Sequence, residues 1–408
     1  MFFPKAVFCR AFQLAFRAAL PILPYREPKI IDSCARVPEI LALEGAKKPL
    51  IVTDPGIIAN KLLDPLTAAL EDTRRPSEEN PYAVFGETQP NPSVDNVEAA
   101  LALYHREQCD SIIAIGGGSA LDCAKALGAR VAYPKKTIGQ MRGILRVLRK
   151  LPLLIAIPTT AGTGSEVTLA AVITDTENHD KYALMSFPLI PHYAVLDAKL
   201  TYSLPPNLTA STGMDALTHA VEAYIGRSTT AKTRKWALEA TKLVFENVEA
   251  AYSNGTNHIA RENILHAAYT AGAAFSQSYV GYIHAIAHSL GGQYGTPHGL
   301  TNAVIMPYVL EAYGTSAHRK LHELGIAAGV CNPDDTATIG ARTFIEAIRT
   351  LNANMGIPDK LPGILEGDIP AMARHAEREA NPLYPVPKLM TQSELAHLYY
   401  DIADWSSR

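Results

Sequence analysis

Short apolar runs alternate with stretches of helical periodicity through the first half of the chain. Each apolar run is rich in β-branched residues and ends in a cluster of turn-forming residues, as buried strands do. The four predicted strands are residues 49–54, 82–86, 111–118 and 151–159. Between the second and the third, apolar residues recur on one helix face: Val94, Val97, Ala100, Leu101 and Tyr104. This alternation predicts an α/β domain with a parallel sheet, whose ligands bind beyond the carboxyl ends of the strands.

The pattern changes near residue 205. A Pro/Ser/Thr-rich segment, SLPPNLTAST (203–212), is followed by alanine-rich segments with a 3.6-residue period that continue to the end. We therefore predict an apolar N-terminal arm (1–26), an α/β domain (27–203) and an all-α C-terminal domain (204–408). A chain of 408 residues is long enough for two domains of ordinary size.

The N-terminal arm has apolar bulk but lacks the uninterrupted core of a signal peptide, because Arg10 and Arg17 break the run. On a helix, Arg10, Gln13 and Arg17 share one face, while Phe8, Phe12, Ala15 and Phe16 lie on another. We expect an arm that packs on its own protein or on a neighbouring subunit. A membrane-surface helix and a docking peptide for a larger assembly are the alternatives.

The composition narrows the class of protein. A formal net charge of −3 gives no reason to expect nucleic acid as a partner, and no apolar run has the length of a membrane span. The five cysteines are scattered and form no CxxC pair, which argues against disulfides and against a cysteine zinc site. This cysteine usage favours the reducing cytoplasm.

Two predicted strand ends carry residues suited to a phosphate-bearing ligand. The third strand ends in GGGS (116–119) before a helix, where glycines permit close backbone approach and helix N–H groups attract phosphate. The fourth ends in PTTAGTGSE (158–166), which is rich in small and hydroxyl residues. Asp54, at the end of the first strand, could accept hydrogen bonds from a ribose diol or simply cap a helix.

Histidine and aspartate residues in the predicted helical domain have metal-ligand spacing. In GMDALTHAVEAY, Asp215 and His219 lie four apart on one helix face. In HAIAHSLGGQYGTPHG, His284 and His288 are also four apart, and His298 follows a turn. A carboxylate with several imidazoles suits Fe²⁺ or Zn²⁺ rather than Mg²⁺ or Ca²⁺. The spacing does not show which of the four histidines bind.

Four motifs in this order resemble the iron-containing (group III) alcohol dehydrogenase family: GGGSALDCAK, PTTAGTGSE, GMDALTHAVEAY and HAIAHSLGGQYGTPHG. GIP (356–358) and NP (381–382) match its weaker C-terminal pattern, so the resemblance runs from about residue 27 to the end. It implies the dehydroquinate synthase-like fold, in which an α/β NAD(P)-binding domain precedes an all-α metal-binding and catalytic domain. It also implies a homodimer or higher homo-oligomer.

The resemblance implies roles for particular residues. Metal ligation falls to Asp215, His219, His284 and His298, and His288 takes the position proposed to relay a proton beside the nicotinamide. The pyrophosphate would be held by Gly117, Gly118 and Ser119. The rest of the cofactor site would be Asp54, Thr159, Thr160, Thr163 and Lys181. Ala170, Phe275 and Val280 match substrate-pocket positions and suggest an apolar pocket.

These observations predict a metal-dependent, NAD(P)-linked alcohol dehydrogenase that interconverts a small, apolar primary alcohol and its aldehyde in a cleft between the two domains. Fe²⁺ is the expected metal, with Zn²⁺ or another divalent ion possible, and NAD the expected cofactor, with NADP possible. The alternatives are a polyol dehydrogenase or sugar-phosphate cyclase of the same fold, an assembly component recruited through residues 1–25, and a catalytically silent metal-binding protein.

Overall fold

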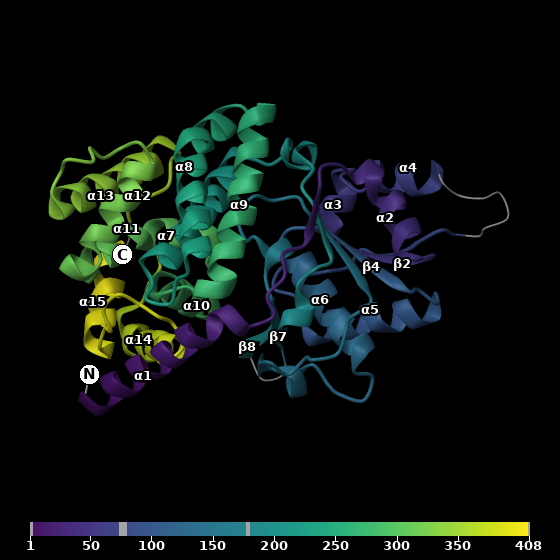
Figure 1. The fold of residues 1–408 in the computed structure, drawn as a ribbon, viewed down its shortest axis with the longest axis horizontal. Coiled ribbons are helices and arrows are strands. Elements are labelled where there is room, and N and C mark those ends of the chain that lie inside the picture. The colour runs from purple at the N-terminus through teal and green to yellow at the C-terminus, as the bar shows by residue number, and fades with distance from the viewer. Residues whose placement is uncertain (1–2, 73–79, 177–179, 407–408) are drawn as a thin grey trace. The chain divides into compact units, whose positions relative to one another are not determined.

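A computed structural model describes residues 3–72, 80–176 and 180–406 of the chain. These residues divide into two compact units, one formed by residues 24–202 and the other by residues 1–23 together with 203–408. Figure 1 labels the elements of both units. Among the described residues, no helix is both long and apolar enough to cross a membrane.

The unit of residues 24–202 is built around a parallel six-stranded sheet of order β1-β9-β6-β4-β2-β3. Its strands are β1 (Lys29–Ile31), β2 (Pro49–Val52), β3 (Ala83–Phe85), β4 (Ser111–Gly116), β6 (Leu153–Pro158) and β9 (Tyr193–Val195). A small second sheet has the order β5-β8-β7, with β7 and β8 antiparallel. It contains β5 (Gly143–Ile144), β7 (Ala170–Asp175) and β8 (Asp180–Met185). The predicted α/β class and its parallel sheet are confirmed.

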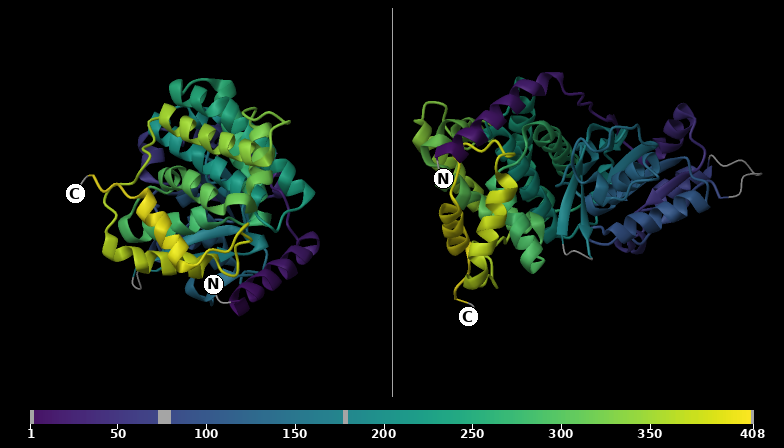
Figure 2. Two further views of the ribbon diagram at one scale, coloured as in Figure 1. Left: turned by 90° about the vertical axis from the view of Figure 1, so that its left-hand side faces the viewer. Right: turned by 90° about the horizontal axis from the view of Figure 1, so that it is seen from below.

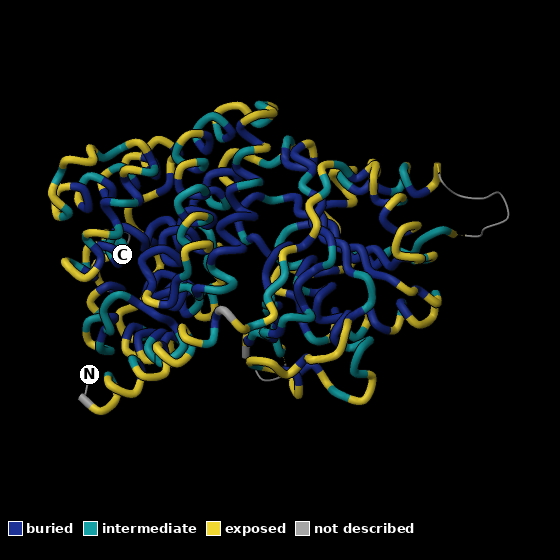
Figure 3. The backbone as a smooth tube through the Cα atoms, in the orientation of Figure 1, coloured by how far each residue is buried: buried dark blue, intermediate teal, exposed yellow. Residues whose placement is uncertain are grey.

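Helices cover both faces of the six-stranded sheet. They are α2 (Val37–Glu44), α3 (Pro55–Ala59), α4 (Asp64–Asp72), α5 (Val94–Arg106) and α6 (Gly118–Ala132). Alternate residues of β4 enter two cores: Ile112 packs with residues of α5 and α6, and Ile113 packs with residues of α2 and α4. The central strands are buried (Figure 3). Both faces of the sheet pack against apolar cores, which explains why these strands appear in the sequence as continuous apolar runs.

The other unit is helical, as predicted for the C-terminal part of the chain. After residue 203 its helices are α7 (Pro206–Ile225), α8 (Ala231–Ser253), α9 (His258–Ser278), α10 (Tyr282–Tyr294), α11 (His298–Tyr313), α12 (His318–Ala327), α13 (Ala337–Asn354), α14 (Ile369–Ala380) and α15 (Gln392–Ile402). Helices α7, α8 and α9 pack closely together, and α10 packs against both α11 and α14. Helices α7 and α10 both pack against α11, so the chain brings together the three helices that carry the Asp–His motifs.

The N-terminal arm forms α1 (Phe3–Ala19) and lies beside the segment that follows α14 (Figures 1 and 2). The side that packs contains Cys9, Gln13 and Leu20, which are 1%, 4% and 7% exposed, whereas Phe8 is 60% exposed and Phe12 38%. Arg17, on the predicted polar face, is exposed. The arm therefore contacts its own unit, but the side with Phe8 and Phe12 faces outward.

Candidate metal and cofactor sites

Three of the four predicted metal ligands converge in the helical unit. Ligand atoms of Asp215, His284 and His298 all lie within 4.8 Å of one another. Asp215 Oδ1 is 3.6 Å from His298 Nε2 and 4.0 Å from His284 Nε2. These separations are compatible with ligand atoms that share one metal at bond lengths of about 2.0–2.2 Å.

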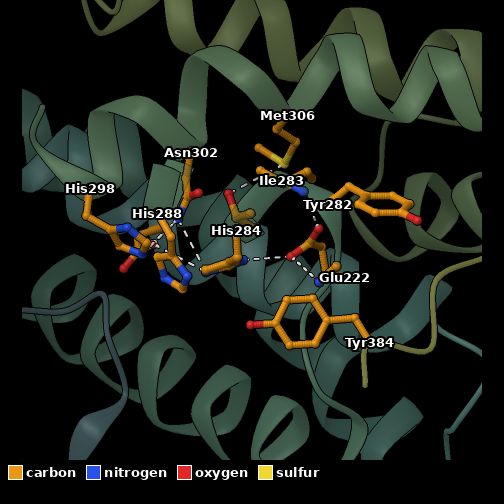
Figure 4. A network of polar contacts seen from close by, with 12 residues as sticks. Glu222, Tyr282, Ile283, His284, His288, His298, Asn302, Met306 and Tyr384 are labelled. Carbon is orange, nitrogen blue, oxygen red and sulfur yellow. Dashed lines mark hydrogen bonds and ion pairs between the residues drawn. The ribbon is translucent and has the colours of Figure 1, made fainter. Parts of the chain in front are cut away.

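Asn302 marks the point on which these ligand atoms converge. It lies one helical turn after His298 on α11, and its Nδ2 donates to Asp215 Oδ1 at 2.8 Å. The same Nδ2 is 3.1 Å from His298 Nε2 and 3.3 Å from His284 Nε2 (Figure 4). Asp215 Oδ1 and the two imidazole Nε2 atoms thus surround one amide NH₂ group. A carboxylate and imidazoles directed to one point fit a divalent transition metal.

His219 lies beside this cluster. Its ring stacks on His284 with centroids 4.5 Å apart, and on the other side on Phe275 at 4.2 Å. The helical period of α7 gives Asp215 and His219 the same face, as the sequence predicts. The structure therefore brings His219 to the ligand cluster, although the close three-residue group does not include it.

Glu222, a residue that we did not single out from the sequence, contacts His284 at Nδ1, the ring nitrogen away from the ligand cluster. Its carboxylate accepts hydrogen bonds from the backbone N–H groups of Gly281 and Ile283, each at 2.8 Å, at the start of α10. Its Oε2 is also 2.6 Å from His284 Nδ1. Figure 4 shows Glu222 and Asn302 on opposite sides of His284. A carboxylate on one ring nitrogen fixes the tautomer that leaves Nε2 available for a metal.

Burial dominates the electrostatics of this pair. It lowers the pKa of His284 well below its usual range, and the neighbouring histidines lower it further. It raises the pKa of Glu222 to about 8, against the backbone hydrogen bonds that favour the carboxylate. A neutral imidazole is the form that binds a metal. A buried carboxylate needs a compensating positive charge, which a divalent cation beyond His284 would supply.

His288, the predicted proton carrier, lies one turn after His284 on α10 and has a different partner. Its Nδ1 is 2.6 Å from Glu379 Oε1 on α14. Its ring stacks on His298 with centroids 5.2 Å apart. His288 is therefore next to the ligand cluster, while its Nδ1 is engaged with a carboxylate outside that cluster.

The glycine- and threonine-rich strand ends meet in the other unit. Strands β4 and β6 are neighbours, with Gly116 paired to Pro158. Gly117 caps α6 and Gly118 is its first residue. A Cβ on Gly118 would be 3.0 Å from Thr163 Cγ2, and one on Gly117 would be 3.6 Å from Thr160 Cγ2. The two loops therefore lie against each other at the N-terminus of α6, where backbone N–H groups favour phosphate.

Asp54 lies beside this point. Its Oδ1 accepts from Ile57 N at 3.1 Å and caps α3. Its Oδ2 would be 3.1 Å from a Cβ on Gly116, whose φ of 150° also favours glycine. The capping role that the sequence left open is therefore present. It places the carboxylate at the carboxyl end of β2, next to the glycine turn.

Ser119 and Lys181 are joined through a residue that the sequence analysis missed. Ser119 Oγ accepts from Asn91 N at 3.2 Å, and Lys181 Nζ donates to Asn91 Oδ1 at 2.8 Å. Asn91 has a φ of 56°, a backbone conformation that asparagine tolerates better than most residues. The NP turn at 91–92 was the available signal, since such dipeptides mark tight loops.

A buried lysine holds the loop after β6. Lys125 Nζ, on α6, donates to Ser165 Oγ at 2.9 Å, to Thr168 Oγ1 at 2.8 Å and to the carbonyl of Ala170 at 2.8 Å. Asp122, one turn earlier, accepts from Ser165 Oγ at 2.7 Å. Burial lowers the pKa of Lys125 to about 8, although Asp122 opposes this. The position of Ala170, at the start of β7, thus depends on Lys125.

The remaining predicted pocket positions lie in the helical unit. Phe275 is near the end of α9 and Val280 precedes α10, and both are partly buried. Phe275 adjoins the ligand cluster, because its ring stacks on that of His219.

Two of the missed residues had a detectable signal. Glu222 lies seven residues after Asp215, and Asn302 four after His298, so both project from helix faces that carry proposed ligands. Glu379 had no such signal, because it is 91 residues from His288 in the chain.

Comparisons with known proteins agree with this description. Residues 31–198 match the iron-containing alcohol dehydrogenase family, and residues 209–403 match the C-terminal part of the Fe-containing alcohol dehydrogenase family. The 1,3-propanediol dehydrogenase of Klebsiella pneumoniae is 38% identical over 367 residues, which cover 89% of this chain and 93% of that protein.

Solved structures give the same result. A crystal structure of a 1,3-propanediol oxidoreductase is similar, with a TM-score of 0.88 and 36% identity over 92% of this chain and 98% of that one. Sulfoacetaldehyde reductase from Bifidobacterium kashiwanohense in complex with NAD⁺ has a TM-score of 0.82 and 28% identity over 93% of this chain and 98% of that one. The fold and sites define an oxidoreductase that acts on alcohols. The chain belongs to the iron-containing alcohol dehydrogenase family.

Proposed function

We propose that this alcohol dehydrogenase reversibly transfers a hydride between a small, apolar primary alcohol and NAD, with Fe²⁺ as its metal. The observation that carries the proposal is the convergence of Asp215, His284 and His298 around Asn302 Nδ2. When bound, the divalent ion supplies Lewis acidity that favours loss of the hydroxyl proton, and the nicotinamide supplies the hydride acceptor.

The chain's own residues would divide the remaining work. Asp215, His219, His284 and His298 hold the metal, and Glu222 fixes the orientation of His284. His288 has Nδ1 on Glu379, so we assign Nε2 as the nitrogen that takes up the released proton.

The cofactor would be held by the loops that meet at the N-terminus of α6. Gly117, Gly118 and Ser119 take the pyrophosphate, with Thr159, Thr160, Thr163 and Lys181 along the rest of the cofactor. Asp54 would accept from the ribose diol and repel a 2′-phosphate, which favours NAD over NADP.

An apolar substrate is favoured by the side chains proposed for the pocket, Ala170, Phe275 and Val280. A diol is the second candidate, because two similar proteins are named for 1,3-propanediol. A second hydroxyl would need a polar partner, and none of these three side chains supplies one. We further propose a cytoplasmic homodimer.

The test combines metal analysis of the purified protein with an NADH-linked screen of alcohols and aldehydes. We expect stoichiometric iron and a higher kcat/KM for 1-propanol than for 1,3-propanediol. A preference for the diol would replace the proposed substrate class with the second candidate. Activity that persists after complete metal removal would contradict the proposed chemistry.

A further inference from the structure

Helix α1 is hydrogen-bonded to a short segment whose Tyr384 side chain shares a hydrogen-bond partner with His288. This anchoring segment, residues 382–387, follows α14 and carries Tyr384. Gln13 Nε2 donates to the carbonyl of Tyr384 at 2.8 Å and to that of Pro382 at 3.2 Å. Arg10 donates to the carbonyls of Val386 at 2.7 Å and Pro387 at 3.1 Å.

The hydrogen bonds that Arg10 and Gln13 donate are directional and partly shielded from water. Gln13 is 4% exposed, and its Oε1 accepts from Arg10 Nη1 at 2.8 Å, so the two side chains fix each other. Hydrogen bonds to a charged donor such as Arg10 are stronger than those between neutral groups. The exposed Lys5–Glu377 ion pair, at 2.8 Å, contributes much less. The arm therefore holds the backbone of the anchoring segment chiefly through Arg10 and Gln13.

Tyr384 connects this segment to His288. Its hydroxyl donates to Glu379 Oε1 at 2.8 Å, the same oxygen that is 2.6 Å from His288 Nδ1. Burial by itself raises the pKa of Glu379, but His288 and the hydrogen bonds from His288, His375 and Tyr384 outweigh it and hold that pKa well below its usual range. Tyr384 Oη and His288 Nδ1 therefore share one carboxylate oxygen, Glu379 Oε1.

A second contact ties α1 to the beginning of α10. The ring of Phe16 meets that of Tyr279 edge-on, with centroids 4.9 Å apart. Tyr279 has a φ of 59°, an unfavourable conformation for a tyrosine that persists only where its surroundings impose it. It lies three residues before Tyr282, the first residue of α10, and its ring is also 6.5 Å from that of Tyr384. The arm thus contacts both the anchoring segment and the connection between α9 and α10.

We propose that Glu379 and Tyr384 are positioning residues for His288, and that α1, through Arg10 and Gln13, holds this pair in place. The inference rests on the proposed role of His288 as proton carrier. It gives the arm a function within its own unit. A His ring with Nδ1 on a fixed carboxylate presents Nε2 in one orientation, whereas without the carboxylate the ring can change rotamer and tautomer.

The test is a double-mutant cycle on the full-length, metal-loaded enzyme. Glu379→Ala is expected to lower kcat roughly 10-fold, because general acid–base catalysis contributes about 10²–10⁴-fold and mispositioning forfeits part of it. Glu379→Gln retains an acceptor and should recover part of the loss. R10A/Q13A and Y384F should lower kcat about 2–5-fold, with KM for NAD and metal content unchanged.

In a His288→Ala background, Glu379→Ala and R10A/Q13A should cause no further loss of kcat, because they act through the same residue. V7A/L14A is the matched control on the exposed side of α1, where Val7 is 52% and Leu14 66% exposed, and it should change nothing. Losses in the His288→Ala background as large as those in wild type would overturn the inference.

Y384F keeps the assay informative if R10A/Q13A fails to fold, since it removes only one hydroxyl. A nitrogen-15 histidine spectrum adds a readout independent of turnover: the hydrogen-bonded Nδ1–H signal of His288 should be present in wild type and lost in Glu379→Ala. An unchanged signal overturns the inference. The proposed function fails separately, if His288→Ala alone leaves kcat unchanged.

Discussion

Each unit contains a buried ionisable side chain on a helix that holds a neighbouring loop: an acidic one in the helical unit and a basic one in the sheet unit. In the helical unit, buried Glu222 accepts backbone N–H groups at the start of α10 and reaches His284. In the sheet unit, buried Lys125 donates to the side chains and carbonyls of the loop after β6. Each places a charge from a neighbouring helix where a loop must be fixed. The difference is that Glu222 also contacts a proposed metal ligand, whereas Lys125 contacts the loop and the first residue of β7.

This difference predicts which change removes the metal. Glu222→Ala leaves the N–H groups of Gly281 and Ile283 without their acceptor and His284 without its orienting carboxylate. We expect metal affinity to fall about 10–100-fold and the free energy of unfolding to fall by about 3–5 kcal/mol. Competition with a chelator and denaturant titration measure the two effects. Unchanged metal affinity would show that Glu222 supports only the helix start.

Lys125→Met is the counterpart. We expect a loss of about 3 kcal/mol in the free energy of unfolding and a higher KM for NAD, because Ser165, Thr168 and Asp122 lose their cation. Metal affinity should stay at the wild-type value, which makes this variant the matched control for Glu222→Ala. A loss of metal in Lys125→Met would contradict the claim that Glu222 supports the metal site and Lys125 does not.

The pH dependence of stability sharpens the same comparison. The pKa of Lys125 in the folded protein, about 8, lies below its ordinary value of 10.5, so the unfolded chain binds more protons between these pH values. The free energy of unfolding that Lys125 contributes should therefore rise between pH 8 and 10.5, by on the order of 1–3 kcal/mol. It should be lost as the pH falls through 8.

The measurement is the difference between wild type and Lys125→Met at each pH. This subtraction removes buried groups that titrate nearby, such as Cys34, whose pKa burial raises to about 12. A flat difference across pH 8–10.5 would mean that Lys125 is as easily protonated in the fold as in water.

The smallest expected effect concerns Asp54. Asp54→Asn keeps an oxygen to cap α3 through Ile57 N but removes the charge next to the glycine turn. We expect a several-fold shift in kcat/KM toward NADP with little change in stability. Asp54→Gly should shift the preference similarly and lose the cap as well. If the preference is the same in all three proteins, Asp54 is only a cap.

The sequence was sufficient for the central strands and for the periodic helices. The predicted strands at 49–54, 82–86, 111–118 and 151–159 correspond to β2, β3, β4 and β6, and the predicted helix corresponds to α5. The last residues of the third predicted strand instead start α6, because Gly117 caps that helix. Strands β1, β5, β7, β8 and β9 were not predicted from the sequence.

For the site, residue pairs within one helix could be predicted from the sequence, but contacts between helices could not. Asp215 with His219, and His284 with His288, are visible as pairs four residues apart, because one helix face carries both members. Contacts between helices are not visible in this way. The Glu379–His288 and Gln13–Tyr384 contacts join positions 91 and 371 residues apart, and only the packing of α1, α10 and α14 brings them together.

The most direct test of the account is the metal content of His284→Ala and His288→Ala, purified side by side with wild type. We predict that His284→Ala contains no bound metal and has no activity, whereas His288→Ala retains the wild-type metal content and turns over slowly. Full metal content in His284→Ala, or loss of metal in His288→Ala, would contradict the assignment of ligand and proton carrier.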